Sequence, residues 1–325
     1  MRRSFNKKVI VFGSCNLDLF FEVPDLSFFV NTGVGAEDGL HFKSHKQAPG
    51  GKGANQAVAA AKAGAKVHYF GAVGKGAHGR FLLENFKKLG IDTKGVKAVD
   101  TPTGVAVIFN QPGGKHKAIV SHAANLVAKQ NQIPDALLNK NSIVVLQAES
   151  DIKQNAALVA RGKKRGATIV YNVAPAVALP AKTLSCLDYL IVNRPEAEVI
   201  AKNIGMDASD LRLFAQAMTR RFKLSCIVTL GEGGVLASLS GSDGCISIPA
   251  LKVKAIDSIG AGDAFVGAFV TALSQNQSPE DAVCHGVVAG ALACTKLGAQ
   301  TSLPSAKEIK KHLPKLKPIS RKKAG

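Results

Sequence analysis

Asp263 is the side chain of this sequence whose surroundings best suit acid–base chemistry. It ends the stretch Asp257-Ser258-Ile259-Gly260-Ala261-Gly262-Asp263, and the apolar run at 264–270 predicts a helix that begins among the glycines. The first backbone N–H groups of a helix have no partner within it, so such a start can hold an anion. Asp263 could therefore take a proton from a substrate hydroxyl while those N–H groups stabilise negative charge. A carboxylate that only caps the helix is the alternative.

A second glycine-rich stretch, Gly50-Gly51-Lys52-Gly53-Ala54-Asn55-Gln56, leads into an alanine-rich segment at 54–63 that predicts a helix. Glycine lets a backbone approach a small polar ligand closely. Asn55 offers two hydrogen-bond donors and an acceptor, which suits the hydroxyl groups of a sugar. A flexible turn before a helix is the alternative.

Two weaker motifs also follow predicted strands: Asn193-Arg194-Pro195-Glu196 and Thr229-Leu230-Gly231-Glu232-Gly233-Gly234. The first could organise Mg²⁺ through water and hold phosphate oxygens, because carboxylate and amide oxygens suit this ion. The glycine turn of the second suits the ribose and phosphates of a nucleotide. Taken alone, an ordinary helix N-cap and a hairpin turn explain the two motifs equally well.

The stretch Gly74-Lys75-Gly76-Ala77-His78-Gly79 matches the dinucleotide-binding pattern G-x-G-x-x-G, and Asp92 lies near the acidic position of that pattern. The pattern normally opens a strand–helix–strand unit, whereas the segment after the predicted helix at 79–89 is short and polar. We therefore predict no dinucleotide site. The sequence holds no GxxxxGK[ST] loop either, so phosphate binding would depend on helix starts.

Strands and helices alternate along most of the chain, and this alternation must position the motifs. Strands are predicted at 9–12, 67–70, 143–147, 168–171, 188–192, 225–230 and 235–239, and helices at 54–63, 79–89, 151–164, 195–202, 208–221, 261–274 and 279–295. The pattern predicts an α/β fold, with a doubly wound, mainly parallel sheet flanked by helices. Extended pieces within 19–47, and a hairpin of 105–109 with 117–121, predict a small second sheet.

The composition is that of a globular protein with a basic surface. The 325 residues are 46% apolar and 20% charged, with a formal net charge of +19, and lysines and arginines cluster near both ends. A nucleic-acid-binding surface is one interpretation, but Trp is absent, only three Tyr are present, and no aromatic residues interleave with the basic tail. We predict a solvated basic surface that also suits anionic nucleotides, with no nucleic-acid partner.

The six cysteines form no CxxC pair and indicate free thiols in a reducing compartment. The N-terminal apolar run at 9–12 is shorter than a signal peptide requires, and no apolar stretch approaches the length of a membrane span. We therefore expect a cytoplasmic protein without a membrane partner.

Taken together, the four glycine-rich and strand-end motifs described above resemble the ribokinase, or PfkB, family of carbohydrate kinases. Both family signatures are present, one from Gly50 to Ala57 with Gly64 and Gly74 at the expected spacing, the other from Asp257 to Val270. The resemblance spans about 9–304. Within the family the sequence is most similar to ribokinases, because Gly50–Gln56, Asn16, Asp18 and Glu149 match their sugar-binding positions. Asn172-Val173-Ala174-Pro175-Ala176 and Gly298-Ala299-Gln300-Thr301-Ser302 match further family segments, with Val173 where Pro is usual.

The resemblance implies a mechanism and its residues. Asp263 would take the proton of the sugar's O5 hydroxyl, and the anion hole for the γ-phosphate would comprise the N–H groups of Gly260, Ala261 and Gly262. The implied sugar-binding residues, besides Asp263, are Asn16, Asp18, Gly51, Lys52, Gly53, Ala54, Asn55 and Glu149. ATP with Mg²⁺ would be held by Asn193, Glu196, Thr229, Leu230, Gly231, Glu232, Gly233, Gly234 and Gly262. A monovalent cation, K⁺, would be bound by Asp257, Ile259, Ala293, Lys296, Gly298 and Ser302, mainly through backbone oxygens.

The resemblance also implies partners and a division of the chain. ATP and a small sugar, D-ribose first, would be the substrates, and the chain would form a homodimer through a small β lid. The expected parts are a large α/β domain at 1–15, 48–103 and 122–310, a lid at 16–47 and 104–121, and a disordered basic tail at 311–325. The chain departs from the family pattern at 31–39, where the family usually has Pro-x-x-Gly-Glu-Thr before the lid, and this departure bears on sugar specificity and on the lid-mediated dimer. Another sugar or a nucleoside (fructose, deoxyribose, adenosine) and a non-catalytic sugar- or nucleotide-binding protein are the alternatives.

Overall fold

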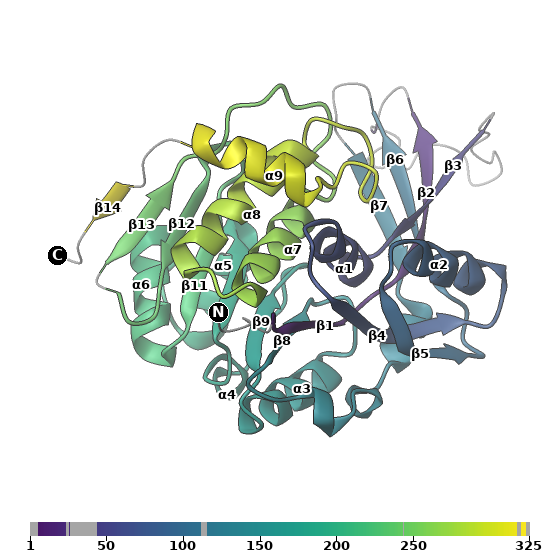
Figure 1. The fold of residues 1–325 in the computed structure, drawn as a ribbon, viewed down its shortest axis with the longest axis horizontal. Helices are drawn as coiled ribbons and strands as arrows, with labels where there is room; N and C mark the ends of the chain where they lie inside the picture. The colour runs from purple at the N-terminus through teal and green to yellow at the C-terminus, as the bar shows by residue number, and fades with distance from the viewer. Residues whose placement is uncertain are drawn as a thin grey trace, which may run out of the picture.

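The structure is a computed structural model that describes residues 6–23, 26, 44–111, 116–242, 244–316 and 320–322. The strands of its main sheet are β1 (Lys8–Phe12), β4 (Val67–Gly74), β5 (Asp92–Val99), β8 (Ser142–Leu146), β9 (Thr168–Asn172), β10 (Tyr189–Asn193), β11 (Ser225–Thr229), β12 (Val235–Ser238), β13 (Cys245–Ile248) and β14 (Ser320–Lys322). They form a ten-stranded sheet in the order β14-β13-β12-β11-β10-β9-β8-β1-β4-β5 (Figure 1). All pairs from β11 to β5 are parallel, and β12, β13 and β14 continue the sheet antiparallel.

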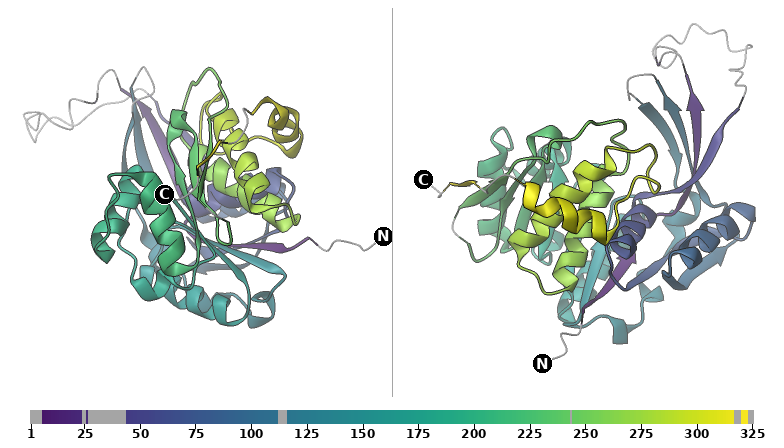
Figure 2. Two further views of the ribbon diagram at one scale, coloured as in Figure 1. Left: turned by 90° about the vertical axis from the view of Figure 1, so that its left-hand side faces the viewer. Right: turned by 45° about the horizontal axis from the view of Figure 1, so that its top comes forward.

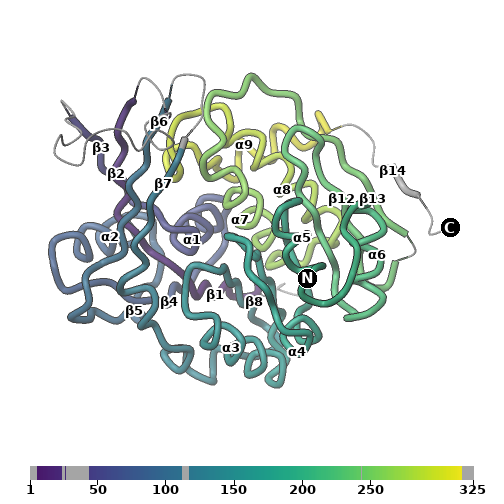
Figure 3. Tube along the Cα trace, turned by 180° about the vertical axis from the view of Figure 1, so that it is seen from behind, coloured from purple at the N-terminus to yellow at the C-terminus, as the bar shows by residue number. Residues whose placement is uncertain are grey.

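Helices cover both faces of this sheet, which confirms the predicted α/β architecture. They are α1 (Lys52–Lys62), α2 (Ala77–Lys88), α3 (Ile152–Lys164), α4 (Ala181–Leu184), α5 (Arg194–Ile204), α6 (Leu211–Phe222), α7 (Ala261–Ser274), α8 (Pro279–Ala293) and α9 (Ala306–His312). One core contains buried residues of α1, α2, α7, α8 and α9, and the other contains those of α3 to α6 (Figures 1 and 3).

The central strand β1 shows why the strands are apolar throughout. Val9 and Val11 pack into the first core, while Ile10 and Phe12 pack into the second. Successive side chains of a strand point to opposite faces, so a strand covered on both sides needs apolar residues at every position. The continuous apolar runs of the sequence therefore correspond to the parallel strands at the centre of the sheet.

A separate four-stranded sheet projects from one end of the main body (Figure 2). Its order is β3-β2-β6-β7, from β2 (Asn16–Glu22), β3 (Lys46–Gly50), β6 (Gly104–Asn110) and β7 (His116–Ser121). Strand β6 pairs with β7 as the predicted hairpin, with Val105 opposite Ser121. The second sheet is thus confirmed, whereas the atypical segment 31–39 lies outside the described residues.

One expectation is wrong. The segment after α2 forms β5, parallel to β4, so Gly74–Gly79 does open a strand–helix–strand unit and our reason for rejecting a dinucleotide site fails. Gly74 and Gly79 have a packing role, because a Cβ on Gly79 would lie 2.0 Å from the Gly74 carbonyl oxygen and a Cβ on Gly74 would lie 2.6 Å from the Thr103 backbone nitrogen. Of the tail at 311–325, the described residues contain the end of α9, the residues Leu313 and Leu316, which pack on the core, and β14, which pairs with β13; disorder of the tail stays a prediction.

No helix within the described residues is both long and apolar enough to cross a membrane.

Candidate active site

Asp263 lies in the first turn of α7 and is 7% exposed. The residue before this helix, Gly260, has a φ of 78°, in the left-handed region that favours glycine. A Cβ at Gly260 would also lie 2.9 Å from the Ala299 carbonyl oxygen, so glycine lets the turn pack against the 298–302 segment. The first N–H groups of α7, of which that of Ala261 donates to the Ser258 carbonyl oxygen over 3.2 Å, and the Asp263 carboxylate therefore lie at the same helix start.

Two amides from α1 hold the Asp263 carboxylate. Asn55 Nδ2 donates to Asp263 Oδ2 and Gln56 Nε2 donates to Asp263 Oδ1, each over 3.0 Å. Both oxygens are thus engaged, on one side, by donors from the second glycine motif. The structure thereby brings together the two signatures, which lie more than 200 residues apart in the sequence.

The start of α1 lies beside Asp263. Gly51 precedes the helix with a φ of 87°, and the helix begins at Lys52, so Lys52 to Asn55 form its first turn and not a free loop. Glu149 Oε2 accepts hydrogen bonds from Ser14 Oγ (2.6 Å) and from the Lys52 backbone N–H (3.0 Å). Glu149 therefore joins the end of β8 to the start of α1.

The strand β2 adds two buried polar side chains to the same region. Asn16 Oδ1 accepts from Asn125 Nδ2 (2.7 Å), whereas Asp18 Oδ1 is buried without a hydrogen-bond partner. The Asp18 carboxylate fits against Gly50, because a Cβ on Gly50 would lie 1.9 Å from Asp18 Oδ2. An unsatisfied buried carboxylate oxygen is costly, so this atom is a candidate acceptor for a ligand hydroxyl.

One lysine lies among the carboxylates of the site. Burial lowers the pKa of Lys52, but Asp263, Glu149, Glu196 and Asp18 together outweigh burial and raise it. Burial, with Glu149 and Asp263 next, raises the pKa of Asp18 to about 7, and Lys52 opposes this shift. The site therefore concentrates negative charge around a single ammonium group that stays protonated.

The pKa of Asp263 is raised chiefly by burial and, to a smaller extent, by Glu149. Lys52, Asn55 and Gln56 act in the opposite direction, because a positive charge and two donated hydrogen bonds favour the ionised carboxylate. These three neighbours therefore counteract the effect of burial and favour the ionised form that a general base needs.

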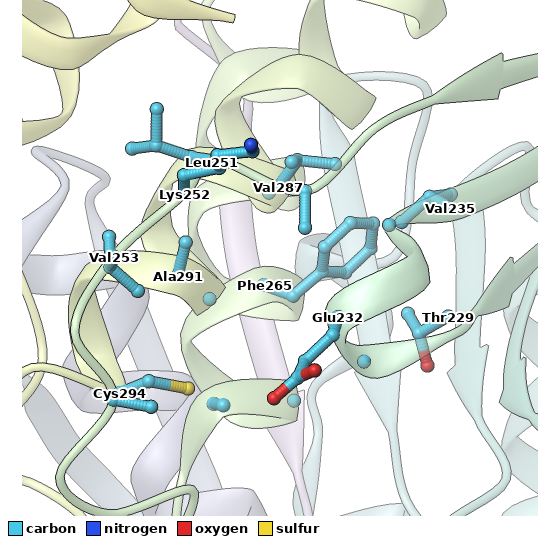
Figure 4. Close-up of a pocket in the computed structure, with 18 residues that line it drawn as sticks. Thr229, Glu232, Val235, Leu251, Lys252, Val253, Phe265, Val287, Ala291 and Cys294 are labelled. Atoms are coloured by element: carbon cyan, nitrogen blue, oxygen red, sulfur yellow. The ribbon is translucent and has the colours of Figure 1, made fainter.

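A cavity of about 580 Å³ leads from the turn after β11 to the start of α7 (Figure 4). Its walls are mostly apolar, with Thr229 and Glu232 at the turn and Ala261 and Gly262 at the helix start. The other lining residues are Gly231, Gly234, Val235, Ala250, Leu251, Lys252, Val253, Ala255, Phe265, Gly286, Val287, Gly290, Ala291 and Cys294. Size and lining suit a flat aromatic group, with its polar end directed toward the α7 start. The turn that joins antiparallel β11 and β12 is thus a hairpin turn and a cavity wall at once.

Asn193 and Glu196 form a capping box at the start of α5. Asn193 Oδ1 accepts from the Glu196 N–H (3.0 Å), and Glu196 Oε2 accepts from the Asn193 N–H (2.8 Å). Burial raises the pKa of Glu196, and Lys52 lowers it, which places this carboxylate close enough to interact with the site. The cap is therefore real, and a role in holding Mg²⁺ through water stays a prediction.

The residues predicted to bind K⁺ lie on two segments that contact each other. Asp257 Oδ1 accepts from the Ile259 N–H and Asp257 Oδ2 from the Gly298 N–H, each over 2.9 Å. Lys296 directs its ammonium to Glu308 (3.1 Å), and Ala293 ends α8, so both could contribute only carbonyl oxygens. Ser302 is buried and donates to the Ala299 carbonyl oxygen. Hard oxygen donors on adjoining segments fit an alkali cation, although the described residues hold no group of three or more His, Cys, Asp or Glu side chains able to bind a metal.

The sequence analysis missed several polar side chains of the site. Gln147 donates to Gln56, and Gln300 donates to Asn55, so both lie directly behind the amides that hold Asp263. Asn125 is bonded to Asn16. Gln147 stands two residues before Glu149, and that nearness was the available signal; Asn125 carried none.

Comparisons with known proteins agree with this geometry. The pfkB family of carbohydrate kinases matches residues 6–306. The chain is 32% identical over 311 residues to a ribokinase of Haemophilus influenzae (93% of this chain, 97% of the relative) and 32% identical over 294 residues to a deoxyribokinase of Salmonella typhi (89% and 95%).

Solved structures give the same result. A ribokinase from Thermotoga maritima superposes with a TM-score of 0.85 at 31% identity, over 95% of this chain and 99% of the other. A ribokinase from Arabidopsis thaliana, complexed with ribose and ATP, superposes with a TM-score of 0.80 at 27% identity, over 95% and 99%. The expected ribokinase-like fold is confirmed. The chain is therefore a sugar kinase that belongs to the pfkB family of carbohydrate kinases.

Proposed function

We propose that this chain transfers the γ-phosphoryl group of ATP to the O5 hydroxyl of D-ribose, with Asp263 as the general base. The observation that carries the proposal is the placement of the Asp263 carboxylate. It is buried at a glycine-preceded helix start, held by two amides, and the nucleotide-sized cavity ends at the same turn. A hydroxyl in front of Asp263 would lose its proton to the carboxylate as it attacks the phosphorus.

The start of α7 and Lys52 would bind the transferred phosphoryl group. The N–H groups of Gly260, Ala261 and Gly262 would form the anion hole, because N–H groups at a helix start have no partners within the helix. The Ala261 N–H would exchange its 3.2 Å bond to the Ser258 carbonyl oxygen for one to the phosphoryl group. The Lys52 ammonium supplies a positive charge among carboxylates that would otherwise repel a phosphate. Catalysis then rests on positioning and charge stabilisation, as phosphoryl transfer requires.

The sugar would bind between α1, β2 and the end of β8. Asn16, Asp18 and Glu149 would accept or donate hydrogen bonds to its hydroxyl groups, and the Gly51–Asn55 stretch would line its other side. The partnerless Asp18 Oδ1 supports this arrangement, since a sugar hydroxyl would satisfy it. The relatives named ribokinase, and the solved ribokinase with ribose and ATP, make ribose the first candidate.

The nucleotide would occupy the cavity of Figure 4, with the turn Thr229 to Gly234 along its ribose and phosphates. Asn193 and Glu196 would hold Mg²⁺ through water, and bound Mg²⁺ neutralises charge on the phosphates. The K⁺ set of Asp257, Ile259, Ala293, Lys296, Gly298 and Ser302 would hold the cation beside the α7 start. There Asp257 also ties the turn to the 298–302 segment.

We further propose that the four-stranded sheet is the lid of the sugar site and the contact of a cytoplasmic homodimer. The exposed apolar side chains of β7, Ile119 (58% exposed) and Val120 (39%), support a contact there. The division into a large domain at 1–15, 48–103 and 122–310 and a lid at 16–47 and 104–121 belongs to the same proposal.

A substrate panel tests the function. The purified chain with ATP, Mg²⁺ and K⁺ should convert D-ribose to ribose 5-phosphate with a higher kcat/KM than for deoxyribose, fructose or adenosine, measured as ADP release and by product NMR. A preference for deoxyribose would favour the second candidate, to which the deoxyribokinase relative points. ADP release that no pentose stimulates would refute the substrate assignment.

A further inference from the structure

The amides that hold Asp263 are themselves held by other amides. Gln147 Nε2 donates to Gln56 Oε1 over 2.7 Å, and Gln300 Nε2 donates to Asn55 Oδ1 over 3.1 Å. We propose that Gln147 and Gln300 are positioning residues for the proposed phosphoryl transfer, because each fixes which end of the next amide faces Asp263. This inference rests on the proposed function for its kinetic consequences and on the hydrogen-bond geometry for its structural part.

An amide side chain is directional, since its nitrogen only donates and its oxygen only accepts. Gln56 could rotate by half a turn about its last torsion at little steric cost, and its oxygen would then face the Asp263 carboxylate. Two neighbours oppose this rotation. The reversed Gln56 would present N–H groups to the N–H groups of Gln147, and it would lose the 3.0 Å hydrogen bond that its Nε2 donates to Asn172 Oδ1. Gln147 contributes the donor side of this constraint and so helps to keep the Gln56 donor on Asp263.

The orientation of Gln147 is itself constrained. Gln147 Oε1 is buried without a hydrogen-bond partner. It packs against Gly13, since a Cβ added to Gly13 would lie only 1.9 Å from this oxygen. An unpaired buried acceptor is unfavourable. The Gln147 amide therefore keeps this orientation because its nitrogen, at the other end of the amide, makes a favourable contact. That contact is the 2.7 Å bond to Gln56, which a reversed Gln147 would lose. The backbone of Gln147 is fixed as well, since its carbonyl oxygen accepts from Asn155 Nδ2 (2.7 Å).

Gln300 orients Asn55 in the same way, and we call Gln147 with Gln56 the first arm and Gln300 with Asn55 the second arm. Asn85 Nδ2 donates to Gln300 Oε1 (2.9 Å), which turns the nitrogen of Gln300 toward Asn55. The backbone of Gln300 is anchored by Lys62, whose ammonium donates to its carbonyl oxygen (2.9 Å). Gln300 belongs to the 298–302 segment that also packs on Gly260, so this arm ties the α7 start to the carboxylate it carries.

Loss of either arm has a predictable electrostatic result. The two donated hydrogen bonds favour the ionised form of Asp263 against the effect of burial. An amide that can reverse withdraws its donor for part of the time and presents an oxygen instead, so the pKa of Asp263 rises. The acidic limb of the kcat profile, which reports the base in the ternary complex, should then move to higher pH.

The test is a double-mutant cycle on Gln147 and Gln56. Gln147→Met keeps the volume but removes the amide, and should lower kcat about tenfold while KM for ribose changes less than about threefold. Its acidic limb should shift to higher pH. Gln147 acts through Gln56, so Gln147→Met should matter little once Gln56 is replaced. The double variant Gln147→Met/Gln56→Met should therefore have a kcat less than about twofold below that of Gln56→Met alone. Gln300→Met should reproduce the pH shift through Asn55.

Gln216→Met is the matched control, since Gln216 is a buried glutamine of α6, 6% exposed and on the opposite core. It should leave kcat and the pH limb unchanged even if it lowers Tm. Equal losses of kcat in both backgrounds, or an unshifted acidic limb in Gln147→Met, would overturn the inference. If wild-type enzyme phosphorylates no sugar, the proposed function fails instead. The pKa of Asp263 from carboxyl NMR then decides this inference: a higher pKa in Gln147→Met supports it, and an unchanged pKa refutes it.

Discussion

The contact between α1 and α7 at Gly267 sets the distance from Asp263 to the amides that hold it. A Cβ on Gly267 would lie 2.3 Å from Ala59 Cβ and 2.7 Å from the Ala60 backbone nitrogen. Thr271, one turn further along α7, clamps the same pair of helices, because its hydroxyl lies 3.2 Å from the Ala60 carbonyl oxygen and 2.7 Å from that of Gly267. Helix α1 carries Asn55 and Gln56, so this packing and the catalytic geometry are mechanically linked.

Gly267→Ala should therefore lower both stability and kcat, although residue 267 does not contact the Asp263 carboxylate. Ordinary van der Waals contact begins near 3.4 Å, so the two helices must separate by about 1 Å to accept the methyl group. The 3.0 Å hydrogen bonds from Asn55 and Gln56 to Asp263 would lengthen to about 4 Å and be lost. Overpacking of this kind costs about 1–3 kcal/mol of unfolding free energy. A displacement of about 1 Å at a catalytic group can cost on the order of 10²-fold in kcat.

The assays are thermal unfolding and steady-state turnover with ATP and ribose. The matched control is Gly76→Ala at the start of α2, where a Cβ meets no atom within 4 Å and φ is −75°. The control should keep Tm and kcat close to those of the wild type. A Gly267→Ala enzyme with wild-type kcat would refute the idea that this contact sets the geometry of Asp263.

Three further predictions concern charged groups of the site. Because the folded-state pKa of Asp18 is about 7 against 3.8 ordinarily, the folded protein binds more protons than the unfolded chain between these values, so Asp18 costs stability as pH rises through this range. Asp18→Asn should flatten the fall of Tm from about pH 4 to 8, and an unchanged slope would contradict the shift. Glu149→Gln weakens the acceptor for Ser14 and Lys52 and should raise KM for ribose about tenfold with a smaller change in kcat; unchanged KM would remove Glu149 from the sugar site. Replacing K⁺ by tetramethylammonium should lower wild-type kcat several-fold and leave Asp257→Ala nearly unaffected, whereas equal rates of the wild type in both salts would argue against a cation site.

Much of this architecture could be predicted because local patterns were strong. The apolar runs of the parallel strands and the glycine-preceded helix starts located α1, α7 and the central sheet within a few residues. The predictions failed where a segment is exposed: β5 is an edge strand of sequence Asp92-Thr-Lys-Gly-Val-Lys-Ala-Val99, and none of its residues is fully buried, with Val96 only partly packed on one core and Val99 on the other. Such a strand lacks the apolar run by which buried strands are found.

The helix α9 was missed for a different reason. The lysines from 307 onward suggested a solvated basic surface, although Ser305 and Glu308 form a capping box that starts α9. A single buried side chain, Ile309, then holds this short helix on the core. The capping signal was present in the sequence and was outweighed by charge.

The supporting amides could not be derived from the sequence. Gln147 lies 91 residues from Gln56, and Gln300 lies 245 residues from Asn55. Only the folded sheet brings the end of β8, the first turn of α1 and the 298–302 segment to one point. Glutamine has no motif that marks it as part of such a chain, so its role appears only with the coordinates.

The rate of phosphoryl transfer by Asp263→Asn tests the central claim most directly. The substituted amide is nearly the same shape but cannot accept a proton, so single-turnover transfer from ATP to ribose should fall by at least about 10²-fold, with ribose affinity by calorimetry largely kept. A transfer rate within a few-fold of the wild type would show that Asp263 is not the base.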